Sequence, residues 1–286
     1  MARKLTNIGC LPVLMRTDDG QADLREFQDS AEIPGAAAVS IGATGDFLER
    51  AARFISTGAR ILCIDTANGF HAAVGHAVTQ LRKSRVPIKI IAGNVGSVEG
   101  YSFLHRMGVD AVRVGIGSGS ACSTSIATGI GMGQVSLLLE IQKYRKDAEL
   151  GLWKGIPHPC PAVIADGGIK EPGDFAKALF LGADVIMVGK YLAGTDESPG
   201  EIIDRGTIKL KRFAGEASRA VKGDAAKHVE GVSTLVPYKG PVSEVIQELA
   251  DGLKSSMAYM NCTTIEAFRN KRDEYNVVQL TDNARL

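Results

Sequence analysis

The chain has 286 residues, of which 45% are hydrophobic, and its 33 Lys and Arg balance 32 Asp and Glu to give a formal net charge of +1. We expect one domain over residues 1–286, because α/β barrels often reach this length as a single unit. The balanced charge argues against nucleic acid or a membrane as partner, and the lack of a long apolar run or secretory signal predicts a cytoplasmic protein.

Short apolar runs rich in Val, Ile and Ala recur along the chain and lack clear polar alternation. Runs of this kind are typical of strands that are buried on both faces. The predicted strands are 10–16, 35–41, 60–65, 88–94, 111–116, 162–166 and 184–189. Helical patterns lie between them at 45–58, 71–85, 97–108, 134–152 and 173–182, and several end at a glycine that would act as a C-terminal cap.

The repeated order of strand and helix predicts a parallel sheet with right-handed crossovers, either closed into a barrel or open and doubly wound. The barrel is favoured because motifs rich in Gly, Asp and Asn follow the strands at 65–69, 93–95, 115–120 and 165–168. We therefore predict an α/β fold of the (β/α)8 TIM barrel type.

Only seven strands can be counted before Leu192, and residues 2–7 look like the tail of a helix, so the first barrel strand is expected to precede Met1. The chain after Leu192 is predicted to form loops and a C-terminal helix. The segment from 207 to 240 is rich in Lys, Gly and Ala and has the profile of a mobile lid over a ligand.

The most informative segment is GIGSGSACST, residues 115–124. Its alternate glycines let the backbone turn tightly and approach a ligand, and the hydroxyl of Ser120 suits a phosphate. The backbone N–H groups of such a turn would favour the thiolate of Cys122, a candidate nucleophile. The plain alternative is a glycine-rich loop with a small buried cysteine.

Two further loops have the character of a phosphate site, with Asp166-Gly-Gly168 after one strand and Val188-Gly-Lys190 after the next. Consecutive loops of this kind form the phosphate site of many barrels. Asp166 could bind ribose hydroxyls, although an Asp at the end of a strand is often only a helix cap.

The five cysteines and five histidines show neither CxxC pairs nor the spacing of metal ligands. We therefore predict reduced thiols and assign no zinc site or disulfide.

Four motifs in order, GIGSGSACST, ADGGI (165–169), AGTDESPGE (193–201) and VPYKGP (236–241), resemble the IMP dehydrogenase and GMP reductase family. The resemblance covers roughly residues 5 to 280. It implies a cysteine that attacks C2 of a purine nucleotide and a nicotinamide cofactor, NADPH or NAD, that exchanges a hydride with that carbon. It also implies a homotetramer.

The resemblance assigns a role to each matching position. Catalysis would use Cys122 as nucleophile, Thr124 to assist the leaving group or water, and Glu216 in proton transfer. The nucleotide would be bound by Ser120, Asp166, Gly168, Gly189, Lys190 and Glu230. Asp65 and Asn94 would face cofactor and substrate, and a potassium ion would be held by the backbone carbonyls of Gly117, Gly119 and Cys122.

Within the family, the chain resembles the reductase more than the dehydrogenase. It lacks the inserted pair of regulatory domains and the Arg-Tyr pair of the dehydrogenase flap, and it has Asn68 where dehydrogenases more often have His or Gln. It departs from the reductase at Arg219, where a Glu is usual, and Glu216 is the nearest substitute. The leading prediction is NADPH-dependent reductive deamination of GMP to IMP. The alternatives are NAD-dependent oxidation of IMP to XMP and a non-catalytic, nucleotide-binding member of the family.

Overall fold

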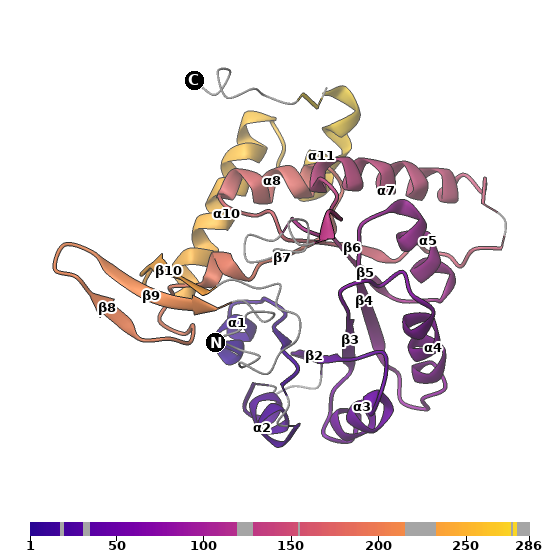
Figure 1. The fold of residues 1–286 in the computed structure, drawn as a ribbon. Coiled ribbons are helices and arrows are strands. Elements are labelled where there is room, and N and C mark those ends of the chain that lie inside the picture. Colours follow the sequence, from indigo (N-terminus) through magenta and orange to yellow (C-terminus); the bar gives the residue numbers. More distant parts are fainter. Residues whose placement is uncertain are drawn as a thin grey trace.

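The protein is a partial barrel made by a curled parallel sheet. The computed structural model describes residues 1–17, 20–30, 35–118, 128–153, 155–214, 233–275 and 277–278. In this part of the chain the sheet has seven strands, and each pairs in parallel with the next along the sequence (Figure 1). They are β1 (Val13–Leu14), β2 (Ala38–Ile41), β3 (Ile61–Asp65), β4 (Lys89–Val95), β5 (Ala111–Val114), β6 (Ala162–Asp166) and β7 (Val185–Met187).

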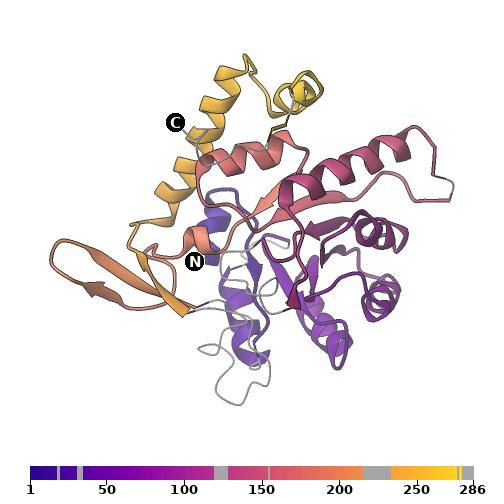
Figure 2. The ribbon, with the colours of Figure 1, turned by 45° about the horizontal axis from the view of Figure 1, so that its top comes forward.

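Helices connect the strands and cover the outer, convex face of the sheet (Figure 2). The helices up to β7 are α1 (Ala2–Asn7), α2 (Gly20–Ser30), α3 (Phe47–Ser56), α4 (Ala72–Leu81), α5 (Val98–Arg106), α7 (Gln134–Glu149) and α8 (Pro172–Phe180). After β7 come the 3-10 helix η1 (Lys190–Leu192), then α10 (Val242–Tyr259), α11 (Ile265–Asn270) and a second 3-10 turn η2 (Lys271–Glu274). Within the described ranges, no helix has the length and apolar character needed to cross a membrane.

Alternate side chains of each strand face the two sides of the sheet. Leu62 and Ile64 of β3 are fully buried in the large cluster that joins the sheet to the helices. Cys63 lies in a smaller buried cluster with Ala38, Ile91 and Ile164 from neighbouring strands, on the concave side. The sheet is therefore apolar on both faces, which explains why the sequence shows apolar runs instead of alternation.

The predicted alternation of strands and helices is confirmed, and the seven predicted strands are the seven strands of the sheet. Helix α2 was not predicted, because its sequence is largely polar. Its position is fixed by Phe27, which is buried against the ring of Phe54, and by Asp23, which pairs with Arg50 of α3.

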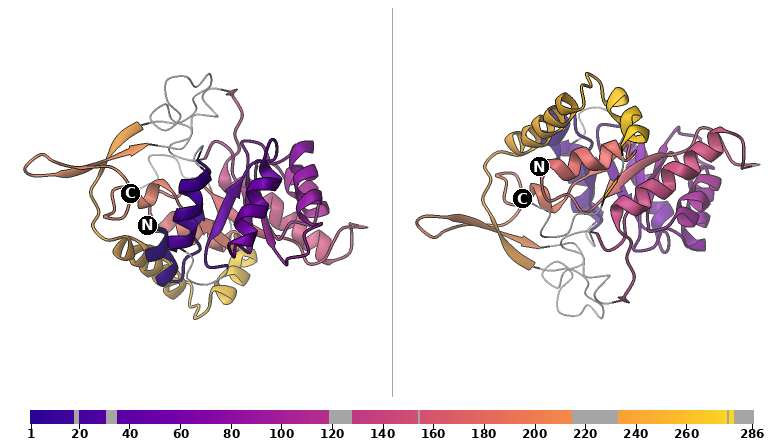
Figure 3. Two further views of the ribbon diagram at one scale, coloured as in Figure 1. Left: turned by 90° about the horizontal axis from the view of Figure 1, so that it is seen from below. Right: turned by 90° about the horizontal axis from the view of Figure 1, so that it is seen from above.

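The chain after Leu192 differs from the prediction of loops and one helix. A three-stranded antiparallel sheet forms from β8 (Ile202–Asp204), β9 (Lys209–Ala214) and β10 (Ser233–Pro237), and it projects from the barrel (Figure 3). Both ends of the predicted lid at 207–240 are thus strands, while residues 215–232 between them lie outside the described part.

Lys211 explains why this strand was missed. The side chain is buried, and its Nζ donates to the backbone carbonyls of Thr195, Asp196 and Ser198 at 2.8, 3.1 and 2.7 Å. Lys is almost never fully buried without such partners, so the sequence alone suggests that this lysine is exposed to solvent. Its hydrogen bonds to the neighbouring loop become evident only in the structure.

Candidate active site

Four polar side chains gather at the carboxyl ends of neighbouring strands, on the concave side of the sheet. They are Asp65 at the end of β3, Asn94 in β4, Arg113 in β5 and Asp166 at the end of β6, and we call them the rim cluster. Carboxyl ends of parallel strands meet at one edge of a barrel, the edge that carries the active site in enzymes of this architecture.

Arg113 connects the two carboxylates of the rim cluster. Its Nη1 donates to Oδ1 of Asp65 at 2.6 Å, and its Nη2 donates to Oδ2 of Asp166 at 2.8 Å. The side chain is only 12% exposed, so the guanidinium bridges β3 and β6 in a largely desolvated setting. Charge-assisted bonds of this kind are among the stronger ones in proteins, and they fix both carboxylates.

Burial disfavours the charged form of Arg113, but Cys63, Asp65 and Asp166 outweigh it, so the pKa of the guanidinium is raised and the residue stays cationic. One guanidinium faces two carboxylates, so the rim cluster has a formal charge of −1. The described residues give no donor to Oδ2 of Asp65 or to Oδ1 of Asp166. Free carboxylate oxygens suit the hydroxyl groups of a ribose better than a phosphate.

The amide of Asn94 is oriented by two acceptors. Its Nδ2 donates to Oδ2 of Asp166 at 2.8 Å and to the backbone carbonyl of Gly115 at 2.9 Å. The Oδ1 atom is buried and accepts no hydrogen bond from the residues that are described. Since a buried acceptor without a donor costs about 1–3 kcal/mol, this atom fits a site that a ligand donor completes.

Gly115 begins the loop after β5 and lies directly against β6. Its φ is +133°, and an added Cβ would overlap the backbone carbonyl of Asp166 and lie 2.7 Å from Oε1 of Gln134. Only glycine fits there, and the close contact places residues 115–118, the described start of the GIGSGS motif, beside Asp166. The Oγ of Ser118, in the same loop, donates to that carbonyl at 3.0 Å.

Replacing Gly115 by alanine is expected to lower the free energy of unfolding by about 2–4 kcal/mol, because strain and overlap with Asp166 act together. Chemical denaturation measures the change. Gly58→Ala is the matched control, since Gly58 also has a positive φ, +107°, with nothing within 4 Å of the added Cβ, and should cost about 1–2 kcal/mol. Equal losses in the two variants would show that the overlap with Asp166 has no effect.

The two predicted phosphate loops are neighbours. Asp166 of β6 is paired with Met187 of β7, so Gly168 and Gly189, which follow these strands, are in adjacent loops. Gly168 has a φ of +85°, and an added Cβ at Gly189 would meet nothing within 4 Å. Lys190 begins η1 and is partly exposed, with no polar partner for its side chain in the described part. At these positions the backbone beside the rim cluster is not covered by large side chains, so a ligand could approach it.

Several of the predicted site residues lie outside the described residues, namely Gly119, Ser120, Cys122, Thr124, Glu216 and Glu230. Of the three residues predicted to bind potassium, Gly117 is described, with a φ of +78°. Among the described residues, no three His, Cys, Asp or Glu side chains are grouped so that they could hold a metal ion.

The sequence reasoning missed Arg113, which organises the cluster. A signal was present, since Arg113 is the one charged residue inside the apolar run 111–116. A guanidinium in a strand that is buried on both faces requires a partner, and the predicted Asp65 and Asp166 were available.

Burial raises the pKa of the Cys63 thiol to about 11, despite the nearby Arg113, and burial also raises the pKa of Cys10 and Cys160. The Cys63 thiol therefore stays protonated near neutral pH, and the thiolate is the reactive form. Cys262 is buried.

We expect iodoacetamide to alkylate Cys63 of the folded protein at about pH 8 roughly 100-fold more slowly than in the unfolded chain, because its pKa is raised from 9.0 to about 11. Peptide mapping of the alkylated protein measures the rate at each cysteine, with protein in urea as the reference. Labelling of Cys63 at the same rate in both states would contradict its protonated, buried state.

Comparison with known proteins identifies a family over nearly the whole chain. The family described as "IMP dehydrogenase / GMP reductase domain" matches residues 24–285. Similar proteins include an inosine-5'-monophosphate dehydrogenase of Rhizobium tropici, which is 40% identical over 250 residues, 82% of this chain and 48% of the relative. The same enzyme of Nitrosopumilus maritimus is 36% identical over 79% of this chain and 48% of its own length, and that of Bacillus subtilis is 35% identical over 86% and 51%. The chain thus spans about half the length of the relatives it matches.

Proposed function

The chain belongs to the IMP dehydrogenase / GMP reductase family, and on that premise we propose that it is an oxidoreductase acting at C2 of a purine nucleotide through a covalent adduct with Cys122. The observation that supports the proposal is the rim cluster, which lies at the carboxyl ends of the strands and contacts the start of the loop that leads to Cys122.

We propose IMP as the substrate and XMP as the product, because the similar proteins are named inosine-5'-monophosphate dehydrogenases. This replaces GMP reduction as the leading hypothesis. Asn68 gives less support to the reductase than the sequence suggested. Its Oδ1 accepts from the backbone N–H of Phe70 at 3.0 Å, and this local turn is sufficient reason for an Asn at that position.

In this proposal the thiolate of Cys122 adds to C2 of the hypoxanthine ring, and the adduct loses a hydride to become a covalent imidate. Thr124 and Glu216 then assist the attack of water on C2, which displaces the thiolate. The carboxylate of Glu216 accepts the proton of that water. Asp166 accepts the ribose hydroxyls, while Gly168, Gly189, Lys190 and Ser120 bind the 5′-phosphate and Glu230 binds the purine edge.

The residues present fit a nicotinamide cofactor at the rim cluster. The buried Oδ1 of Asn94 lacks a donor among the described residues, and Asp65 retains a carboxylate oxygen for a hydroxyl group. NAD, when bound there, would supply the acceptor for the hydride on C2. The protein's contribution is to orient both ligands, with the carboxylates of Asp65 and Asp166 held in place by their contacts with Arg113.

The second candidate is the reductive deamination of GMP with NADPH, which uses the same cysteine. It is favoured by the short segment of ten residues between the Gly-Glu-Ala-Ser at 215–218 and Val229, and by the absence of an Arg-Tyr pair in that segment.

Two parallel assays distinguish the reactions. Purified protein is given IMP with NAD in one assay and GMP with NADPH in the other, both in potassium buffer, and cofactor absorbance and ammonia are followed together. The proposal expects NADH and XMP from the first assay. Ammonia release in the second assay, with no turnover in the first, would favour the reductase, and nucleotide binding without turnover in either would favour the non-catalytic alternative.

A further inference from the structure

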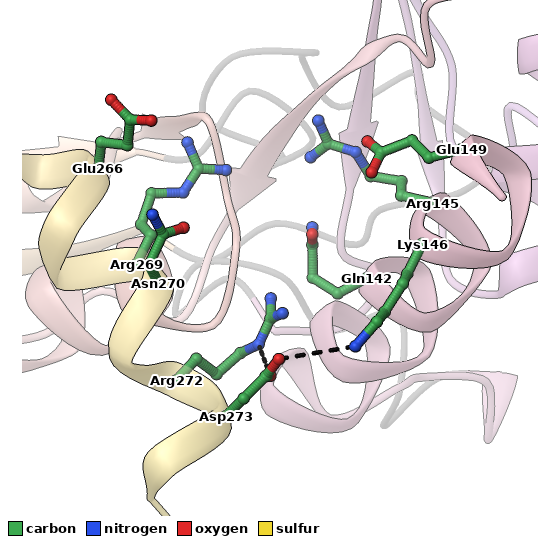
Figure 4. Close-up of a pocket in the computed structure, with 9 residues that line it drawn as sticks. All are labelled: Gln142, Arg145, Lys146, Glu149, Glu266, Arg269, Asn270, Arg272 and Asp273. Atoms are coloured by element: carbon green, nitrogen blue, oxygen red, sulfur yellow. Dashed lines mark hydrogen bonds and ion pairs between the residues drawn. The ribbon is translucent and has the colours of Figure 1, made fainter.

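A polar pocket lies at the edge of the barrel opposite the rim cluster. It has a volume of about 410 Å³ and is formed between α7 and the C-terminal segment of α11 and η2 (Figure 4). Asp184, beneath it, immediately precedes β7, so the pocket is at the amino-terminal ends of the strands, whereas the rim cluster is at their carboxyl ends. Its volume is in the range of small-ligand sites.

Two arginines from different helices converge on Asp184. Arg145 of α7 donates from Nη1 to Oδ2 at 2.9 Å, and Arg269 of α11 donates from Nη2 to Oδ1 at 2.7 Å. Their side chains are 17% and 29% exposed. Two guanidiniums thus share one carboxylate, and Oδ2 of Asp184 also accepts from the backbone N–H of Val163 at 2.8 Å.

Donors in this pocket outnumber acceptors. Each arginine uses one terminal nitrogen on Asp184, and Nε of Arg145 is buried with no partner among the described residues. Asp184 already accepts three bonds and has little capacity for more. A ligand oxyanion that accepts from both guanidiniums would satisfy donors that the protein leaves open.

The other walls are also charged, as Figure 4 shows. Lys146 and Arg272 share a single carboxylate, that of Asp273, at 3.7 and 3.3 Å. Glu149 and Glu266 line the pocket too and make no ion pair within the described part of the chain. Their carboxylates can accept bonds from hydroxyl groups of a ligand whose anionic end contacts the arginines.

We propose that this pocket binds a small phosphorylated molecule that carries hydroxyl groups, such as a sugar phosphate, with the phosphate at Arg145 and Arg269. Guanidinium groups suit this role because their planar N–H groups match the geometry of phosphate oxygens. The site is independent of the proposed reaction, since it lies at the other end of the strands.

The test is a calorimetric titration of the full chain with ribose 5-phosphate, with ribose as the uncharged reference. Arg269→Gln is expected to weaken binding about tenfold or more, because it removes a charge-assisted contact. Arg272→Gln leaves the Arg145–Asp184–Arg269 contacts intact but removes one cation from the lining of the pocket, so it should also weaken binding of the anionic ligand. Arg53→Gln is the matched control, since it removes an exposed arginine of α3 and should bind as the wild type does.

Binding of ribose 5-phosphate at the catalytic rim would survive both pocket variants, so a loss specific to them assigns the ligand to this pocket. The proposal is overturned if both variants bind as tightly as the wild type, or if the wild type binds no ribose 5-phosphate at millimolar concentration. If Arg269→Gln does not fold, Arg272→Gln decides the question, and wild-type affinity in that variant counts against the pocket.

Discussion

Replacing Cys122 by alanine is expected to lower kcat for IMP oxidation by at least about 10³-fold while nucleotide binding changes little. The thiolate forms the covalent adduct in the proposed reaction, and no described cysteine can take its place. Burial keeps Cys63 protonated near neutral pH with a pKa of about 11, and burial also raises the pKa of the Cys10 and Cys160 thiols. Cys262 is buried in the cluster with Phe268. Calorimetry measures the binding of IMP to the variant. Retained binding without turnover would show that the substitution removes the chemical step and leaves the binding site intact.

Cys160→Ala is the matched control for this experiment. Cys160 is partly buried, and burial raises the pKa of its thiol, so its removal should leave kcat unchanged. A Cys122→Ala variant that turns over at the wild-type rate would refute the covalent mechanism, whatever the control shows.

Replacing Arg113 by methionine is expected to lower the free energy of unfolding by about 3 kcal/mol and to raise the KM for the nucleotide. The substitution removes the cation between Asp65 and Asp166 and leaves two partly buried carboxylates without their shared partner. It also releases Asp166, the residue proposed to bind the ribose. Urea denaturation and steady-state kinetics measure the two effects separately.

Arg82→Met provides the comparison on the outside of the barrel. Arg82 pairs with Asp110 at 2.6 Å and donates to the backbone carbonyls of Ile88 and Gly108. Its side chain is one-third exposed and Asp110 keeps its contact with Lys89, so the loss should be about 1–2 kcal/mol with an unchanged KM. If Arg113→Met is no more destabilising than Arg82→Met, and KM stays at the wild-type value, the rim cluster does not position the nucleotide.

The strand order and the edge that carries the rim cluster could be predicted because the central strands, such as β2, β3 and β4, are largely buried on both faces. Such strands show continuous Val and Ile runs, and the polar residues that follow them must share one edge. The motifs that contain Asp65, Asn94 and Asp166 were located in this way, and the family resemblance then assigned Asp65 and Asn94 to the site. The structure brings the three side chains within one hydrogen-bonded network.

The contacts between strands could not be predicted in the same way. Arg113 binds residues 48 and 53 positions away, on β3 and β6, and these distances depend on the curl and register of the whole sheet. The same limit applies to Lys211, whose ammonium donates to three backbone carbonyls of the loop 13 to 16 residues earlier in the chain. It also applies to Asp23, whose partner Arg50 is in the next helix. From the sequence alone, each of these charged residues would be predicted to be solvent-exposed, because its partner is not evident there.

In the proposed mechanism a purine nucleotide becomes covalently attached to Cys122 during turnover. Protein turning over IMP and NAD is denatured rapidly in acid, digested, and the peptide containing Cys122 is examined by mass spectrometry. We expect a nucleotide adduct on that peptide and unmodified peptides for Cys10, Cys63, Cys160 and Cys262. Formation of NADH with no adduct on Cys122, or with the adduct on another cysteine, would contradict it.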